Sequence, residues 1–349
     1  MTIFHEKRVV SPATWDFDVA TIVSRLEAYL SAQLACPIQI EDFVRLTGGL
    51  SWITGIFVVR TALPHDLNGR VLVVKIGSPR GLMAPYSAEP QAMAMRIFAD
   101  YPEVPVPNLL WCSDDLAILG APFLITSKVE GAELNPFVPG IGLRNPGDRD
   151  NIGSQFADVL GAMHAVDPGD DHGQARSGGA RYCGVEQVDS WQRRYESWAS
   201  KPYPVIELAA SWLRRHSPAA ARVVVVHGDY RIGNFLVHAG RITAVLDWEM
   251  AHFGDPHEDL SWAMMPEVRL TELISHGDFI ARYQARSGLQ VLPESMRYYR
   301  ILTLYKLVMI NLGGIAGFER GGQDLRMACM GFLVPLYLMR LARALEEVV

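Results

Sequence analysis

The sequence predicts an α+β fold of two lobes, with a small antiparallel-sheet lobe at residues 1–126 and a larger, mainly helical lobe at residues 127–349. Two observations support this prediction. Strand-like apolar segments succeed one another up to residue 126, whereas most of the chain after the linker-like stretch SKVEGAELNPFVPG has helical character. In addition, 349 residues are enough for each lobe to bury a core of its own.

Composition and charge place the chain among ordinary soluble proteins. Hydrophobic residues make up 49% of it, and a net charge of −6 gives no reason to expect a nucleic-acid partner. The four cysteines lack CxxC spacing, which argues against a structural zinc site and a disulfide framework and suits a reducing compartment. No signal-peptide pattern opens the chain, and no uncharged apolar run is long enough to cross a bilayer. We therefore expect a cytoplasmic protein without a membrane partner.

The first lobe is expected to combine a leading amphipathic helix with several strands and one inner helix. Apolar residues from Val19 to Leu30 recur at helical spacing, and Pro90 stands in the first turn of a second helical stretch, where its missing N–H costs nothing. The segment VLVVKI is a buried strand interrupted by one lysine, Lys75. In order, the expected elements are helix 18–34, strands 43–46, 56–60 and 71–76, helix 89–99, and strands 109–112 and 122–126.

The second lobe contains the stretch HGDYRIGNFLVHAGRITAVLDWEMAHFGDP, in which apolar strands alternate with polar residues. The valines at 223–226 form a buried strand that ends at His-Gly-Asp, and a second strand is expected at 242–246. Strand, short loop and second strand then bring Asp229, Asn234 and Asp247 into one cleft. Oxygen ligands and bases gathered in a cleft indicate metal-assisted chemistry.

Phosphoryl transfer from ATP needs a divalent metal, a carboxylate that orients the acceptor hydroxyl and a lysine that holds the α- and β-phosphates. Asp229 is the candidate for the carboxylate that accepts or orients the proton. Asn234 would bind one Mg²⁺ and Asp247 would bridge both ions, since magnesium prefers hard oxygen ligands. Lys75 would reach the phosphates and be held by Glu89, because a lysine in a buried strand needs a partner.

Three consecutive motifs of the second lobe, HGDYRIGNFL, LDWEMAHFGDP and EDLSW, resemble the aminoglycoside phosphotransferase family, a branch of the protein-kinase-like fold. The resemblance implies that TGGLSW is the phosphate loop, with Gly48, Gly49 and Ser51 at the nucleotide. It also implies that FLITSKVEG is the hinge where the adenine binds, through the backbone of residues such as Ser127 and Val129. ATP and Mg²⁺ follow as the expected cofactors.

Within that family the chain is most similar to the subgroup that includes kinase-like domains fused to some acyl-CoA dehydrogenases. LDWEMAHFGDP and the later YYRILTLYKLVMINLGGIA carry this likeness. Members of the subgroup phosphorylate the hydroxyl of 4-hydroxyacyl-CoA thioesters, so the resemblance implies a small-molecule hydroxyl acceptor of that type. Asp-Trp-Glu replaces the Asp-Phe-Gly of protein kinases, and Glu249 either adds a metal contact or orients a water.

A protein kinase is excluded because only a few residues separate Asp247 from Gly254-Asp255-Pro256, which leaves no room for a peptide-binding activation segment. Other polar residues of this region are expected to be structural. His227 should hydrogen-bond the loop backbone, Asp255 should hold the loop, and His164 should be a core or helix-end histidine.

The acceptor is the least defined part of the hypothesis. Segment 193–222 is rich in arginine and lysine, which favours an anionic acceptor or is simply a solvated helical face, and its aromatic residues suit an apolar acyl group or a helix-packing core. An aminoglycoside or other antibiotic is the alternative acceptor. The C-terminal segment 332–349 is expected to form an amphipathic helix that packs on its own lobe, and the sequence assigns no oligomeric state.

Two hypotheses from other classes stay open. One is a catalytically inactive kinase fold that binds nucleotide. The other is a metal-dependent hydrolase, for which a His/Asp-rich set could bind two metals. That set consists of His227, Asp229, His238, Asp247 and His252.

Overall fold

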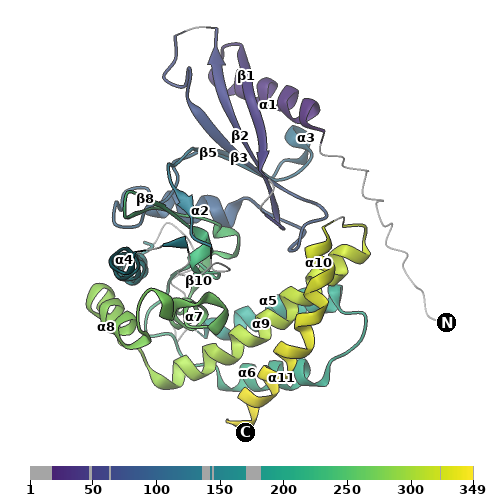
Figure 1. Ribbon diagram of the computed structural model, residues 1–349. Coiled ribbons are helices and arrows are strands. Elements are labelled where there is room, and N and C mark those ends of the chain that lie inside the picture. The colour runs from purple at the N-terminus through teal and green to yellow at the C-terminus, as the bar shows by residue number, and fades with distance from the viewer. Residues whose placement is uncertain are drawn as a thin grey trace, which may run out of the picture.

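A computed structural model describes residues 18–46, 49–62, 64–135, 142–143, 145–169, 182–322 and 324–348. Figure 1 shows a small lobe built around a twisted sheet above a larger lobe of helices, which confirms the predicted two-lobed α+β class. The sheet ends at Ser127 of β5 (Phe123–Ser127), after which the chain enters the helical lobe.

The small lobe is a five-stranded antiparallel sheet, in the order β1-β2-β3-β5-β4, with α1 packed on one face. Burial alternates along β3: Leu72, Val74 and Ile76 are buried in the core shared with α1, so Lys75 projects from the opposite face. This alternation explains why an apolar strand carries one lysine. The other elements are α1 (Val19–Leu34), β1 (Ile38–Leu46), β2 (Trp52–Thr61), β3 (Val71–Gly77), β4 (Leu109–Ser113) and α3 (Leu116–Leu119).

The helix α2 (Glu89–Phe98) belongs to the small lobe by sequence, but it packs against the large one. Its buried residues join the hydrophobic cluster of the helical lobe, and the Phe98 ring lies 5.4 Å from the ring of Trp248. In Figure 1, α2 lies between the sheet and the helices. It therefore couples the strand that carries Lys75 to the loop that follows Asp247.

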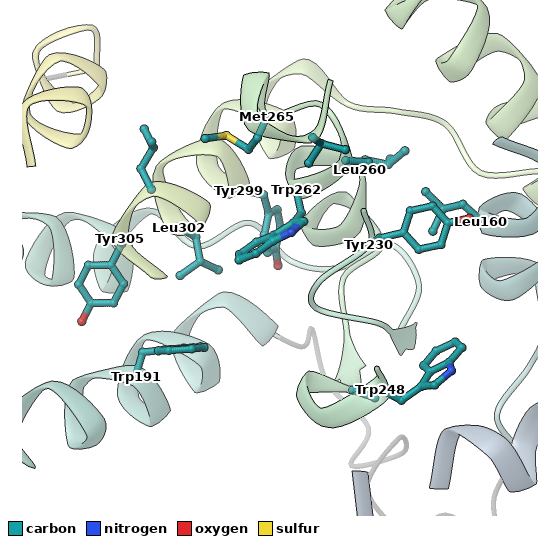
Figure 2. Packing of buried hydrophobic residues seen from close by; sticks show 14 of the residues in the cluster. Leu160, Trp191, Tyr230, Trp248, Leu260, Trp262, Met265, Tyr299, Leu302 and Tyr305 are labelled. Atoms are coloured by element: carbon teal, nitrogen blue, oxygen red, sulfur yellow. The ribbon is translucent and has the colours of Figure 1, made fainter. Parts of the chain in front are cut away.

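The large lobe surrounds the long helix α9 (Pro293–Glu319), which packs against α5, α6, α7 and α11. Figure 2 shows part of this core, in which Trp262 and Trp191 lie near Tyr299 and Leu302 of α9. The elements are β6 (Ala132–Glu133), α4 (Pro146–Ala165), α5 (Cys183–Trp198), α6 (Pro204–His216), β7 (Val224–Val226), η3 (Ile232–Asn234), β8 (Phe235–His238), β9 (Arg241–Val245), η4 (Trp248–Met250), β10 (His252–Gly254), α7 (His257–Ala263), η5 (Pro266–Val268), η6 (Leu270–Glu272), α8 (His276–Ser287), α10 (Leu325–Cys329), η7 (Met330–Phe332) and α11 (Leu333–Glu346).

Two helical segments are long and apolar enough to span a membrane by length and composition alone. In α9, 72% of the apolar window is buried inside the protein, as expected of a core helix, whereas the corresponding fraction for Leu325–Glu346 is 22%. This second segment exposes apolar side chains such as Leu325 and Phe332. On its other side α11 packs against α9 and α6 of its own lobe, as predicted.

Candidate active site

The loop that carries Asp229 begins where β7 ends. β7 pairs with β10, and the chain then turns through His227 and Gly228. Gly228 has a φ of +82°, and a Cβ at this position would lie 2.7 Å from the carbonyl oxygen of Met250. A side chain is therefore excluded on both conformational and steric grounds, which accounts for glycine between His227 and Asp229.

Asp259 of α7 anchors the loop that carries Asp229. Its carboxylate accepts the backbone N–H groups of His227 at 2.7 Å and Gly228 at 2.8 Å, and it lies 3.2 Å from His164 Nε2. Burial alone would raise the pKa of Asp259, but its hydrogen bond with His164 and the backbone donors hold that pKa below its usual value. His164 is fully buried, as predicted for a core histidine. Sequence reasoning assigned no role to Asp259.

His227 and Asp255 were both predicted to be structural, and the hydrogen bonds of each agree with this prediction. His227 Nε2 donates to the Leu246 carbonyl at 2.9 Å and Nδ1 accepts the Asp229 N–H at 3.2 Å, which confirms that this histidine bonds to the loop backbone. Asp255 was expected to hold the turn Gly254-Asp255-Pro256 rather than contact substrate. Its carboxylate accepts from the N–H of His257 at 2.9 Å, two residues further on, which agrees with that expectation.

Asp229 and Asn234 lie together, as the spacing predicts. Asn234 Nδ2 donates to Asp229 Oδ2 at 2.8 Å and to the Asp229 carbonyl at 2.9 Å. Arg231 Nε approaches the two carboxylate oxygens at 3.2 and 2.9 Å, and Trp262 Nε1 donates to Oδ1 at 2.8 Å. Arg231 and Trp262 were not among the expected site residues.

Lys75 reaches across from the sheet to the loop after β9. Its Nζ lies 2.9 Å from Asp247 Oδ1 and 3.1 Å from Gln91 Oε1. Burial would raise the pKa of Asp247, but Lys75 and the nearby Arg231 lower it overall. Asp247 has a φ of 65°, an uncommon value for a non-glycine residue that directs the chain into η4.

The prediction that Glu89 holds Lys75 is wrong. Glu89 is exposed and bonds to Arg96, with Arg96 Nη1 at 3.2 Å from Glu89 Oε1, while Gln91 takes the place at the lysine. Two residues correspond to about 200° around a helix, so Glu89 and Gln91 point to opposite sides of α2. The partner of Lys75 on this helix is therefore a neutral amide.

Glu249 faces the phosphate loop. Trp52 Nε1 donates to Glu249 Oε2 at 2.9 Å, and a hydrogen bond from Ser51 also reaches this carboxyl group. Burial and the neighbouring Asp247 raise the pKa of Glu249 to about 8. Gly49 has no room for a side chain, because a Cβ there would lie 2.8 Å from the Trp52 carbonyl oxygen. Gly48 lies outside the described residues.

The hinge follows β5 directly. The N–H of Ser127 donates to Asn108 O at 2.9 Å, and that of Lys128 donates to Val71 O at 3.3 Å. Both bonds fix the exit of the strand against the sheet. Val129 follows these two anchored residues, and no backbone hydrogen bond to it is found within the described part of the chain.

The oxygen ligands present are compatible with magnesium. Both hydrogen bonds of the Asn234 side chain use Nδ2, so Oδ1 is the atom available to a cation. Asp247 supplies carboxylate oxygens on the facing loop, and Glu249 a further carboxyl group. Two or three such ligands suit an ion that keeps several waters and completes its shell with phosphate oxygens.

Two members of the set proposed for a two-metal hydrolase, His238 and His252, have partners of their own. His238 is exposed at the end of β8, 4.0 Å from Glu130, and His252 pairs with the buried Glu258 at 3.2 Å. No group of three or more His, Cys, Asp or Glu side chains that could hold a metal occurs in the described part of the chain. The observation on which the hydrolase alternative depended is therefore removed.

Comparisons with known proteins identify the family of the chain and its curated relatives. The model of the family described as "Phosphotransferase enzyme family" matches residues 60–299. Mouse acyl-CoA dehydrogenase family member 10 is 30% identical over 238 residues, which cover 67% of this chain and 22% of that protein. Rat acyl-CoA dehydrogenase family member 11 is 31% identical over 241 residues, 63% of this chain and 30% of its own. The chain thus spans less than a third of the length of these curated relatives.

Solved structures share the fold. A putative aminoglycoside phosphotransferase from Ralstonia eutropha JMP134 has a TM-score of 0.67 at 23% identity, covering 93% of this chain and 98% of that one. A thermostable mutant of the aminoglycoside phosphotransferase APH(4)-Ia, in a ternary complex with AMP-PNP and hygromycin B, has a TM-score of 0.59 at 16% identity, covering 91% and 98%. At these identities the likeness shows the fold alone.

Proposed function

Because the chain belongs to the phosphotransferase enzyme family, we propose that it is an ATP-dependent kinase that transfers the γ-phosphoryl group to a hydroxyl of a small molecule. The observation that carries the proposal is the pairing of Lys75 with Asp247 beside the Asp229–Asn234 pair. The lysine comes from one lobe and the other three residues from the other, so the site forms where the lobes meet.

Each residue has a role in the transfer. The acceptor oxygen forms a bond to the γ-phosphorus as the bond from that phosphorus to the ADP oxygen breaks, and the hydroxyl proton passes to Asp229. Asn234 and Asp247 would hold Mg²⁺, which neutralises the phosphate charge when bound. Lys75, released from Asp247, would hold the α- and β-phosphates. Glu249 would either join the metal or keep its proton and its bond to Trp52.

Nucleotide contacts are assigned to the other two segments that the resemblance identified. The backbone of Gly49 and the hydroxyl of Ser51 lie in the loop that would cover the phosphates, and Ser51 is buried. The peptide of Val129 would meet the adenine, with Ser127 fixing the hinge against the sheet. Gly48 keeps its assignment as a sequence-based prediction.

For the acceptor we propose an anionic acyl-CoA-type molecule that carries a hydroxyl on its acyl chain. The curated relatives are named acyl-CoA dehydrogenase family members. LDWEMAHFGDP, which contains Asp247 and Glu249, is one of the two segments that resemble kinase-like domains fused to such enzymes. A polycationic aminoglycoside is the second candidate, because one structural neighbour was solved with hygromycin B. A binding module without turnover is the third.

One arginine of the basic segment 193–222 supports an anionic acceptor. Arg193 is exposed, and Arg214 pairs with Asp189 at 2.8 Å. Arg194, in contrast, is turned inward: Nη1 donates to Met83 O at 3.0 Å, and the guanidinium stacks on Trp191 and Trp198 at 5.6 and 5.7 Å. Its desolvated guanidinium has further N–H groups with which to bind a carboxylate or phosphate.

The first test is an ATP-consumption assay with Mg²⁺ against 4-hydroxyacyl-CoA thioesters, aminoglycosides, macrolides, amino alcohols and sugars. We expect turnover with the thioesters that falls by at least about 100-fold in Asp229→Asn, since the base is removed. Arg194→Met should raise KM for the thioester, and the exposed neighbour Arg193→Met is its matched control. Efficient turnover of kanamycin-type drugs alone would reverse the ranking of acceptors, and ATP binding without any turnover would favour the binding module.

We also propose a cytoplasmic location without nucleic-acid or membrane partners, on the basis of the charge and the cysteines. Subcellular fractionation tests this proposal, and recovery of the protein in a washed membrane pellet would contradict it.

A further inference from the structure

We propose that Trp262 is a positioning residue for the base of the transfer, a proposal that rests on the proposed role of Asp229. The indole Nε1 of Trp262 donates to Asp229 Oδ1 at 2.8 Å, and Asn234 Nδ2 donates to Oδ2 at 2.8 Å. One donor on each oxygen fixes the plane of the carboxylate. A carboxylate held in one plane presents its remaining lone pairs in one direction, as proton transfer requires.

The third donor to this carboxylate, Arg231, marks where the acceptor would bind. Arg231 Nε lies 2.9 and 3.2 Å from the two oxygens, and its side chain is 40% exposed. Trp262, by contrast, is only 6% exposed. The arginine can therefore swing aside for the acceptor hydroxyl, whereas the indole stays in place throughout the reaction.

The spacing of residues along α7 explains how Trp262 is held. Asp259 and Trp262 are three residues apart and lie on the helix face toward the Asp229 loop, one anchoring its backbone and the other its carboxylate. Glu258 and Trp262 are four residues apart, and Lys306 of α9 bridges them. Its Nζ lies 2.6 Å from Glu258 Oε1 and 5.2 Å from the centroid of the Trp262 ring.

Lys306 also lies 5.4 Å from the centroid of the Trp191 ring, so the lysine is stacked between two indoles. Figure 2 shows Trp262 in the middle of the core and Trp191 on a neighbouring helix. A cation over the face of an indole draws electron density from the ring, which makes its N–H a stronger donor. Of the two indoles, Trp262 is the one that donates to Asp229.

The test compares Trp262→Phe with Trp191→Phe. Each removes an indole from one face of Lys306, but only the first removes a donor from Asp229. With MgATP and a short-chain 4-hydroxyacyl-CoA thioester, Trp262→Phe should lower kcat by about 10- to 100-fold with KM for ATP within about twofold. In Trp191→Phe, which leaves the indole donor to Asp229 in place, kcat should stay within about threefold of the wild type.

A second measurement keeps the inference testable if Trp262→Phe does not fold or if the thioester is no substrate. In ¹⁵N-tryptophan-labelled protein, Asp229→Asn should move one indole N–H resonance of the eight tryptophans upfield, since a charge-assisted hydrogen bond becomes a neutral one. No movement, or an equal loss of kcat in both phenylalanine variants, would overturn the role of Trp262 as a positioning residue. Absence of turnover of every acceptor in the panel together with the resonance shift would overturn the kinase proposal and leave the hydrogen bond in place.

Discussion

Two lysines of this protein bind carboxylates at nearly the same distance but in different surroundings. Lys75 lies 2.9 Å from Asp247, and the two side chains are 19% and 32% exposed. Lys306 lies 2.6 Å from Glu258, and each side chain is 1% exposed. A partly exposed pair can exchange its partners for a metal and a phosphate, whereas a pair sealed in the core cannot. The first pair is thus suited to binding ligands and the second to holding the structure.

Two glutamates nine residues apart show the same contrast in their protonation. Burial alone would raise the pKa of both. Lys306 and His252 more than offset that effect at Glu258 and hold its pKa at about 2, whereas Asp247 adds to it at Glu249, whose pKa is about 8. Glu258 has its cation within the fold. Glu249 instead lies beside the carboxylate of Asp247, and a bound metal ion would supply the cation that it lacks.

The largest expected effect is on the buried pair. Lys306→Met leaves Glu258 charged and without its lysine in the core, and removing one partner of a buried ion pair costs about 3–5 kcal/mol of unfolding free energy. Urea unfolding followed by circular dichroism measures this change. The double variant Lys306→Met/Glu258→Gln should recover part of the loss, because no charge remains buried at that position. A single variant as stable as wild type would show that the pair is no structural anchor.

In the partly exposed pair of Lys75 and Asp247, substitution should lower activity rather than stability. Lys75→Met removes a preorganised donor aimed at the phosphates, and we expect kcat to fall about 10²- to 10³-fold. Its unfolding free energy should change by less than about 1 kcal/mol, as for other solvent-accessible ion pairs. Turnover and thermal unfolding of the same preparation measure both effects. Equal losses of stability in Lys75→Met and Lys306→Met would erase the distinction between the two pairs.

The raised pKa of Glu249 predicts that the stability of the protein depends on pH. Its pKa of about 8 in the folded state exceeds the ordinary glutamate value of 4.5, so between these pH values the folded state binds more protons than the unfolded one. The unfolding free energy should therefore fall as pH rises from about 5 to 8. Mg²⁺ favours the ionised carboxylate and should flatten this slope if Glu249 contacts it.

The measurement is Tm against pH for wild type and Glu249→Gln, with and without Mg²⁺. The raised pKa of His252 gives a slope of the same sign, but it is common to both proteins and cancels in their difference. A difference that does not vary with pH would mean that Glu249 is ionised throughout. If Mg²⁺ leaves the slope of this Tm difference against pH unchanged, Glu249 does not contact the metal and only keeps its hydrogen bond with Trp52.

Sequence patterns predicted the parts of this molecule that depend on local periodicity. The apolar run VLVVKI, interrupted by one lysine, predicted the strand β3, and the valine run predicted β7 and the loop that follows it. Asp229 and Asn234 were correctly expected to lie together, because they share one short loop. These predictions need no knowledge of how the two lobes face each other.

Contacts between separate elements could not be predicted in this way. Whether Glu89 or Gln91 faces Lys75 depends on the rotation of α2 about its axis, and α2 is oriented by packing on Trp248 of the other lobe. Asp259 and Trp262 lie in EDLSW, a motif noticed for its resemblance only. Their roles follow from the position of α7 beneath the loop, and an all-buried helix of seven residues gives no periodic signal.

The smallest expected effect tests this rotation of α2 directly. Glu89 and Arg96 form an exposed pair, so Glu89→Gln should change the unfolding free energy by less than about 0.5 kcal/mol and turnover by less than about twofold. Gln91→Ala removes a hydrogen bond to a charged group and should cost about 1.5 kcal/mol, or more than tenfold in kcat/KM for ATP. A loss in Glu89→Gln that matches the one in Gln91→Ala would mean that α2 turns its acidic face toward Lys75 when nucleotide binds. In that case the neutral partner seen here would belong to the nucleotide-free state, and Asp247 would be released from the lysine as Glu89 replaced it.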